Sequence, residues 1–278
     1  MSFLVLLLAV WIEKFSALRQ RVQRDGGWLQ ELNKLEARPR WVNRPWLVLV
    51  VMVLLPVALL ALLLWVLEPV AYGLLALPVH LLVVIYSLGR GDLLADLGPF
   101  RDAWRREDLQ AATHVAKRDL DIEADDGDQL LERVQGHLLW QAYQSFFAVI
   151  FWYFLLGPVA ALSYRLLALA AEHSHNAGVA ERAGQLRHAF DWVPVRLLAA
   201  SFALVGNFVA VSRVMLHELL NWNISAADLI DKVGLVAGEI PKPMAGPDGI
   251  NSLDRLWELL LRAAVLWYAG FALWTVLA

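Results

Sequence analysis

The chain has 278 residues, of which 59% are apolar and 18% are charged, and its formal net charge at pH 7 is −3. Soluble domains average about a quarter charged residues, so this chain cannot hide its apolar surface from water by folding on itself. The small net charge gives no support for nucleic-acid binding as the main activity. Because cysteine is absent, disulfides, thiolate metal sites and cysteine nucleophiles are excluded.

The clearest membrane-spanning segment covers residues 46–67. Its 22 residues carry no charge, and as a helix they would be about 33 Å long, enough to cross a hydrocarbon core. A second uncharged stretch, residues 70–88, follows after a two-residue link, which predicts a transmembrane helical hairpin. Pro56 and Pro78 lie inside these helices, where neighbouring groups can satisfy the carbonyls that proline leaves without a donor.

Three later apolar stretches predict further membrane segments. Residues 138–171 form one long span or two segments bent at Gly157 and Pro158, and the sequence permits both. Residues 197–212 predict either a short span, which we favour, or a helix packed beside others, and we expect residues 257–278 to form the last span. Residues 1–12 lack the basic start and the cleavage site of a signal peptide, so they predict an uncleaved short span or an interfacial helix.

The basic residues predict the orientation. Residues 13–45 contain eight Lys or Arg against four acids and flank the best span, so the positive-inside rule places them in the cytoplasm. The basic residues are Lys14, Arg19, Arg21, Arg24, Lys34, Arg38, Arg40 and Arg44. The hairpin then returns the chain, which makes residues 89–137 a cytoplasmic helical region.

Helical spacing and capping residues organise the region that follows. Leu93, Leu97, Phe100 and Trp104 recur every three or four residues, which predicts one apolar helix face docked on the membrane domain. Asp108 is a typical N-cap for the next helix.

Asp126 caps a further predicted helix, which enters the bilayer. His137, Gln141 and Gln144 fall on one face of it, as a polar stripe. The stripe indicates either hydrogen bonds between helices or a polar cavity.

Three motifs carry a family resemblance. AVIFWYFLLGPVAALSYR at 148–165 is followed by FDWVPVRLLAAS at 190–201 and preceded by KRD at 117–119. In order and spacing they resemble the CobD/CbiB membrane family of cobalamin biosynthesis, and most of all its AmpE branch. The resemblance covers residues 90–215, with a looser match in the N-terminal helices.

The AmpE resemblance implies a bacterial inner-membrane protein associated with the control of β-lactamase induction, as a regulatory signalling modulator. The alternative is an ATP-dependent amide-forming enzyme like the adenosylcobinamide-phosphate synthases of CobD/CbiB type, whose chemistry needs acids for Mg²⁺ and cations for phosphate. The positions that match polar and acidic residues of those synthases are Trp140, Gln141, Gln144, Ala168 and Ala171. Because most of these acids are lost, we favour the interpretation without catalysis.

The resemblance and the polar stripe together give seven ligand-binding candidates. They are Arg118, Asp119, His137, Gln141, Gln144, Asp191 and Arg196. The alternatives are structural: Arg118 and Asp119 are simply solvated, and Asp191 and Arg196 form a local ion pair at a helix entry.

The sequence predicts no catalytic residue, no cofactor and no metal site. Glu172, His173 and His175 resemble metal ligands, but histidines two residues apart do not share a helix face. The predicted partners are the lipid bilayer, a small anionic or peptidoglycan-related ligand and a further copy of the chain, with no nucleic acid.

The chain is thus predicted to be an all-α, polytopic membrane bundle with about 4–6 membrane segments and a helical cytoplasmic loop region. Its regions are an apolar segment with a basic linker (1–45), the hairpin (46–88), the cytoplasmic region (89–137), the family core (138–216), a loop (217–256) and the last membrane helix (257–278). Residues 221–254 are predicted to be a surface connection. A pair of segments meeting at Gly157 would return Asp191 to the cytoplasmic side.

Overall fold

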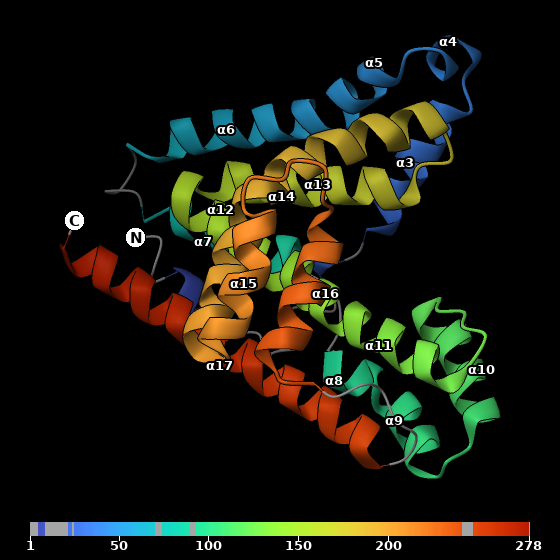
Figure 1. Cartoon of the computed structure of the whole chain (residues 1–278). Helices are drawn as coiled ribbons and strands as arrows, with labels where there is room; N and C mark the ends of the chain where they lie inside the picture. Colours follow the sequence, from blue (N-terminus) through green and yellow to red (C-terminus); the bar gives the residue numbers. More distant parts are fainter. Residues whose placement is uncertain are drawn as a thin grey trace. The chain divides into compact units, whose positions relative to one another are not determined.

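In a computed structural model, the described residues form helices joined by short links, with no strand among them, and these residues are 5–8, 22–23, 25–69, 74–88, 93–240 and 247–277 (Figure 1). This confirms the all-α prediction. Among the described residues, four helices are long and apolar enough to cross a membrane: Pro45–Leu67, Gly127–Leu156, Ala177–Val205 and Asp248–Leu277. Residues 1–12, predicted to be a short span or an interfacial helix, lie outside the described residues except for 5–8, as do Lys14, Arg19, Arg21 and Arg24.

The chain forms two compact units, each made of two stretches of sequence. The first consists of Met1–Arg90 and Ala148–Asp191, and the second of Gly91–Phe147 and Trp192–Ala278.

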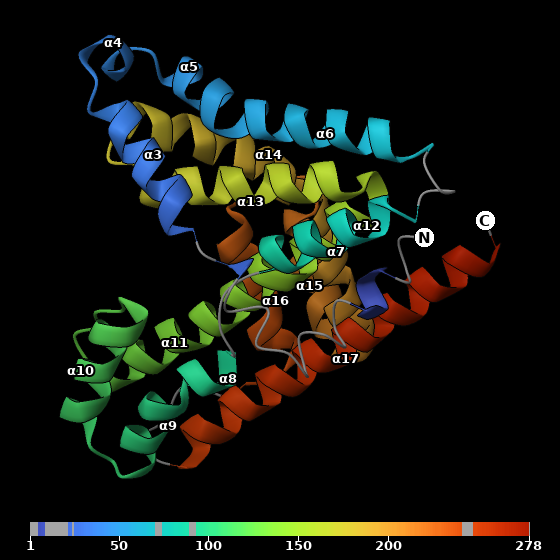
Figure 2. The same ribbon diagram turned by 180° about the vertical axis from the view of Figure 1, so that it is seen from behind.

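The first unit is built on packing between its N-terminal helices and a later helical pair. Its elements are α3 (Gly26–Glu36), α4 (Pro39–Val42), α5 (Pro45–Leu49), η1 (Val50–Leu54), α6 (Leu55–Leu67), α7 (Ala76–Ser87), α12 (Ala148–Leu156), α13 (Pro158–His173) and the beginning of α14 (Ala177–Val205). Buried apolar residues of α3, α5, η1, α13 and α14 form one cluster. α13 lies beside α6 in both views of this unit (Figure 1, Figure 2).

The first candidate span contains a π-helical turn just before Pro56. Proline has no N–H, so Pro56 cannot donate to the carbonyl of Met52 as another residue would in an α-helix. The indole Nε1 of Trp28 on α3 donates to this carbonyl at 3.0 Å. A neighbouring helix therefore satisfies the carbonyl that the proline leaves free, as expected for a helix that crosses lipid.

We expect Trp28→Phe to lower the stability of the purified protein in detergent by about 1–2 kcal/mol, because the Met52 carbonyl loses its donor. In a Pro56→Ala background the same change should cost clearly less, because alanine has an N–H that can donate to the Met52 carbonyl. Thermal unfolding of the four proteins gives the coupling energy. Equal costs of Trp28→Phe in the two backgrounds would show that the indole contributes only its packing.

The second helix of the predicted hairpin is shorter than expected. α7 has 12 residues, which is about 18 Å of helix and less than a hydrocarbon core. Pro78 lies in its first turn, where a missing N–H costs nothing. At its other end, the buried Gln23 side chain donates to the carbonyls of Ile85 and Leu88 at 2.8 and 2.6 Å. Residues 70–73 of the predicted span lie outside the described residues.

The break at Gly157 divides the long apolar stretch into two helices. Gly157 has a φ of +79°, a conformation that costs glycine little and other residues much. Pro158 then occupies the first turn of α13, where its fixed φ suits a helix start. α13 packs back against α12, so of the two alternatives that the sequence left open, the structure has the bent pair.

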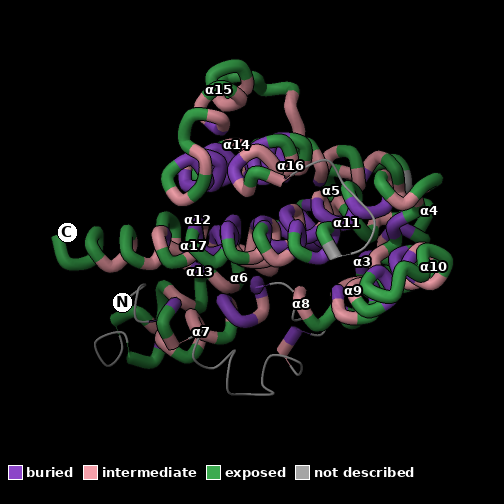
Figure 3. The backbone as a smooth tube through the Cα atoms, turned by 60° about the horizontal axis from the view of Figure 1, so that its bottom comes forward, coloured by how far each residue is buried: buried purple, intermediate pink, exposed green. Residues whose placement is uncertain are grey.

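The second unit is a bundle around α11 and α17. Its elements are α8 (Leu93–Asp96), α9 (Gly98–Arg105), α10 (Leu109–Leu120), α11 (Gly127–Ala142), η3 (Tyr143–Phe147), the end of α14, α15 (Phe208–Glu218), α16 (Ala226–Ala237) and α17 (Pro247–Leu277). α17 contains the predicted last span but begins earlier, at Pro247. Its final turns are exposed (Figure 3).

Both predicted N-caps of this unit are confirmed. Asp108 accepts a hydrogen bond from the N–H of Ala111 at 2.9 Å, and Asp126 accepts one from the N–H of Gln129 at 2.7 Å. The apolar face predicted around Phe100 and Trp104 is buried, and α9 packs against α17. Short polar side chains therefore mark these helix starts, as local capping requires.

The predicted span 197–212 is wrong as a single helix, because α14 ends at Val205 and α15 begins at Phe208. A side chain at Gly206 would clash with the carbonyl oxygen of Ala237, only 2.6 Å from an ideal Cβ. Asn207 then caps α15, accepting from the N–H of Ala210 at 3.0 Å. Glycine at position 206 therefore permits the close approach of the Ala237 carbonyl, and the local cap by Asn207 starts the next helix.

The predicted surface connection 221–254 contains a helix, α16. Ser225 caps it, and Leu229, Ile230 and Val233 are buried. α16 packs on α11 so closely that a Cβ at Gly234 would lie 2.7 Å from Leu139 Cδ1. The spacing of these apolar residues is typical of one face of a helix, so the sequence does indicate α16.

Asp231 on α16 lies in an unfavourable place for a charge. Its Oδ1 is buried without a hydrogen-bond partner, and an ideal Cβ at Gly136 of α11 would be 3.3 Å from that oxygen. Burial, with the charges of Glu132 and Asp228, raises the pKa of Asp231 to about 6 from the ordinary 3.8. The folded protein therefore holds this proton more tightly than the unfolded chain does.

The contribution of Asp231 to the free energy of unfolding is therefore most favourable below pH 3.8, and it is lost as the pH rises through about 6. We expect Asp231→Asn to raise the melting temperature at pH 7.5 and to leave it unchanged near pH 4. The exposed Asp102→Asn is the matched control and should show no such pH-dependent gain. A gain for Asp231→Asn of the same size at both pH values would contradict the role of its charge.

Candidate functional site

A network of polar side chains, buried except for Glu172, joins α13 to α14 in the first unit. The hydroxyl of Tyr164 donates to Asp191 Oδ1 at 2.9 Å, and Arg187 Nη1 donates to Glu172 Oε1 at 2.7 Å. Arg187 Nε lies 3.6 Å from Asp191 Oδ2. The Asp191 residue is only 3% exposed. A buried carboxylate is tolerated there because a cation and a hydroxyl compensate it.

A second buried ion pair lies in the same unit. Arg165 of α13 donates to Asp25, which precedes α3, at 2.9 Å. The two side chains are 16% and 3% exposed. Together the two groups fix α13 to α3 on one side and to α14 on the other, and removing one partner would leave an uncompensated buried charge.

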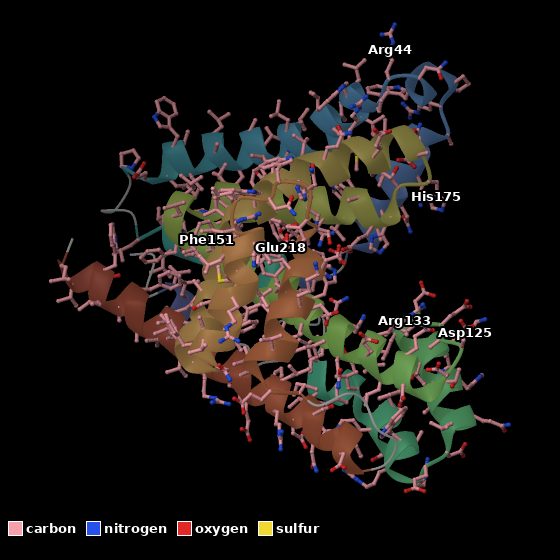
Figure 4. All side chains as sticks on the ribbon, in the orientation of Figure 1. Arg44, Asp125, Arg133, Phe151, His175 and Glu218 are labelled. Carbon is pink, nitrogen blue, oxygen red and sulfur yellow. The ribbon has the colours of Figure 1, made fainter. Side chains whose placement is uncertain are left out.

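An open cavity of about 610 Å³ lies at the end of α3 and the link between α13 and α14. It is lined by Asn33, Glu36, Ala37, His175, Asn176, Ala177 and Gly178. The buried Glu36 carboxylate accepts from the hydroxyl of Ser174 and from the N–H of His175. The ring Nδ1 of His175 lies 3.0 Å from Asn33 Oδ1. Figure 4 shows His175 at this link.

Arg196 caps a helix in the second unit. Its guanidinium donates to the carbonyls of Leu219, Asn221 and Trp192 at 2.5, 2.6 and 2.9 Å. The same group lies 4.2 Å from the ring centroid of Trp192. Two of these carbonyls follow the last turn of α15, where backbone acceptors lack partners within the helix. Arg196 thus ties α14 to the end of α15.

Two of the three residues in the predicted polar stripe, Gln141 and Gln144, contact each other. The Gln144 amide donates to the Gln141 amide oxygen at 2.9 Å, and both are partly buried around the π-helical turn η3. His137 is also partly buried. The deeper polar contact of α11 belongs to Gln135, which donates to Ser252 of α17 at 2.6 Å. That pair supports the structural alternative, hydrogen bonding between helices.

Arg118 and Asp119 pair with each other at the end of α10. The guanidinium donates to both carboxylate oxygens at 2.6 and 2.7 Å. Hydrogen bonding and charge raise the pKa of Arg118, and the same hydrogen bond lowers the pKa of Asp119. Both side chains are largely in solvent, so the pair contributes little to stability.

A smaller pocket of about 360 Å³ lies between the end of α10 and the start of α11, next to the Arg118–Asp119 pair in sequence. Lys117, Glu123, Asp125 and Arg133 are among the residues that line it, and Figure 4 shows Asp125 and Arg133 at this end of the unit. Lys117 pairs with Glu123 at 2.7 Å. In this pocket the carboxylates of Glu123 and Asp125 offset the positive charges of Lys117 and Arg133.

The structure therefore distributes the seven predicted candidates over separate places. Asp191 belongs to the first unit and the other six to the second, so a pocket shared by all seven remains a prediction. The sequence reasoning missed the partners of Asp191. Arg187 lies four residues before it on α14, a spacing that indicates a pair on one helix face. No group of three or more metal-ligating side chains is placed to hold a metal within the described ranges.

The comparisons with known proteins bear on the chain as a whole. A family model described as "Regulatory signalling modulator protein AmpE" matches residues 1–228. The chain belongs to the AmpE family. It is also similar to Protein AmpE of Shigella flexneri, with 28% identity over 158 residues, which are 52% of this chain and 56% of the relative. The matched part thus spans about half the length of that curated relative. No solved structure matches the chain.

The AmpE family match includes every predicted site residue, since all seven lie within residues 1–228. It also includes Tyr164, Glu172 and Arg187, and both segments that line the larger cavity. α17 lies outside the match.

We expect the stabilising effect of Arg196 to depend on the geometry of its guanidinium group as well as on its charge. Arg196→Gln should lower stability by about 2–4 kcal/mol, because several carbonyls lose a charged donor. Arg196→Lys should fall between this variant and the parent, since an ammonium group cannot reproduce the planar fork of donors. Thermal unfolding in detergent measures both, with the exposed Arg255→Gln as the control. Full stability of Arg196→Gln would show that the cap is dispensable.

Proposed function

We propose that this chain is a multi-pass protein of the bacterial inner membrane that modulates β-lactamase induction by binding a small polar ligand, without catalysing a reaction. The observation that carries the proposal is the match to the AmpE family over residues 1–228, whose description is that of a regulatory signalling modulator. The four membrane-crossing helices are consistent with it.

The contacts of the ionisable side chains support a role in binding and coupling more than in amide formation. Arg187 pairs with Glu172 and Asp191, and Arg196 is engaged by helix-end carbonyls. These groups hold helices together, whereas ATP-dependent ligation needs acids that bind Mg²⁺ and cations that bind phosphate. Descent from a CobD/CbiB-type enzyme whose acids have been replaced is part of this proposal.

We place the ligand in the cavity beside Glu36 and His175. Its lining offers a carboxylate, amides and an imidazole, which suit a ligand with several hydrogen-bonding groups, such as a peptidoglycan fragment. The cavity also adjoins the buried pairs in sequence, since Glu172 lies three residues before His175. Binding there would act directly on the ends of α3, α13 and α14.

The same contacts support a cytoplasmic cavity. Because Glu36 bonds to Ser174 and His175, the end of α3 and the link before α14 lie on one side of the bilayer. The positive-inside rule assigns that side to the cytoplasm. In this cysteine-free chain, Ala177→Cys should react with an impermeant maleimide only after the cells are opened. Labelling in intact spheroplasts would reverse the orientation.

The regulatory role is tested in a strain that carries an inducible β-lactamase and lacks this gene. We expect deletion to change the ratio of induced to uninduced β-lactamase activity, and the parent chain on a plasmid to restore it. Glu36→Gln and the cavity-filling Ala37→Trp should fail to restore the ratio at equal protein level, while the exposed Lys34→Ala should restore it.

The outcomes separate the parts of the proposal. An unchanged ratio after deletion would overturn the regulatory role. Restoration by all variants would exclude the cavity and leave the role standing. Rescue of a strain without adenosylcobinamide-phosphate synthase by the parent chain would instead establish the enzymatic alternative.

A further inference from the structure

α15 presents a row of exposed apolar side chains. Val209, Leu216 and Leu220 are 60%, 79% and 82% exposed, and Phe208 is 60% exposed. The opposite face is packed, since Val211 is fully buried and α15 contacts α16. Figure 3 shows exposed residues of α15 alternating with intermediate and buried ones. Large apolar side chains at neighbouring positions of one helix face indicate a surface that something covers.

The helix is fixed at both ends, so this face is held in place. At the start, the N–H of Asn207 donates to the Ala237 carbonyl at 3.2 Å, and the Asn207 amide donates to Glu239 at 2.7 Å. At the end, Arg196 binds the carbonyls of Leu219 and Asn221. These ties make α15 antiparallel to the end of α14. With 11 residues it is about 16 Å long, too short to cross a bilayer.

We propose that the outer face of α15 is embedded in the lipid bilayer, beside the candidate span α14. It continues the exposed apolar surface of the candidate span α14, where Leu197 and Leu204 are 45% and 68% exposed. Lipid covers that surface of a span, and the loop of Gly206 and Asn207 is too short to separate the two helices. Because lipid surrounds the neighbouring span, lipid is also what we expect to cover the outer face of α15.

The polar and aromatic side chains on and after α15 fit a short helix inside the bilayer whose end lies near the lipid headgroups. Arg213 is exposed within the same row as Val209 and Leu216, and its long side chain can reach a lipid phosphate while the helix face stays in hydrocarbon. Trp222 follows the helix, half exposed, with its ring 6.0 Å from that of Trp192. Tryptophan is enriched at this depth of a membrane. This inference is independent of the proposed regulatory role.

The absence of cysteine allows a direct test by site-directed spin labelling. Single cysteines at Val209, Leu216 and Leu220 are labelled, and the full-length protein is reconstituted in vesicles of phosphatidylethanolamine and phosphatidylglycerol. Collisions with oxygen report lipid, and collisions with a water-soluble nickel complex report water. Asp228→Cys, exposed on α16, is the aqueous control, and Val211→Cys is the buried control.

We expect the three outer labels to collide at least several-fold more with oxygen than with the nickel complex, relative to the label at position 228. Nickel accessibility equal to that control would overturn the proposal, because the face would then lie in water. Protection from both reagents, as at position 211, would also overturn it and indicate a protein partner. Distances between labels on two copies would then show whether that partner is a second copy of the chain.

Discussion

The backbone carbonyls of apolar helices must have donors, and long-range side chains supply them in this protein. Trp28 serves the carbonyl freed by Pro56, Gln23 serves the end of α7, and Arg196 serves the end of α15. Arg262 of α17 similarly donates to the Val205 carbonyl at the end of α14 at 3.2 Å. Water supplies such donors to soluble helices, but hydrocarbon cannot. Breaks between these helices are possible because donors from other segments satisfy the carbonyls at the helix ends.

Buried charge follows the same principle in the first unit. Arg187 of α14 pairs with Glu172 of α13 and with Asp191. Arg165 of α13 pairs with Asp25, which precedes α3. Such pairs are costly to bury and costly to break, so they specify one helix arrangement strongly. They also border, in sequence, the link that lines the larger cavity. A ligand at that link would therefore act near the ends of helices that these ion pairs and the apolar cluster hold together.

Much of the local structure could be predicted from the sequence, because local features decide it. The uncharged run 46–67 and the caps Asp108 and Asp126 each depend on residues within a few positions, whereas the sequence left the bend at Gly157 open. α16 was missed although Ser225 and its apolar spacing indicated it, so that error was one of interpretation. The partners of the candidate residues are less accessible from the sequence. Leu219, Asn221 and Tyr164 meet Arg196 and Asp191 through packing, whereas the four-residue spacing of Arg187 and Asp191 indicates their pairing.

The sequence by itself determined that this is a helical membrane protein of the AmpE family, because apolar length and ordered motifs are properties of the chain. Only the tertiary structure decided that the Ala237 carbonyl lies against Gly206, where it leaves no room for a side chain. It also decided that Arg196 binds carbonyls at the end of α15, and that Glu36 meets Ser174 and His175. These contacts join residues far apart in the chain, and no local spacing encodes them.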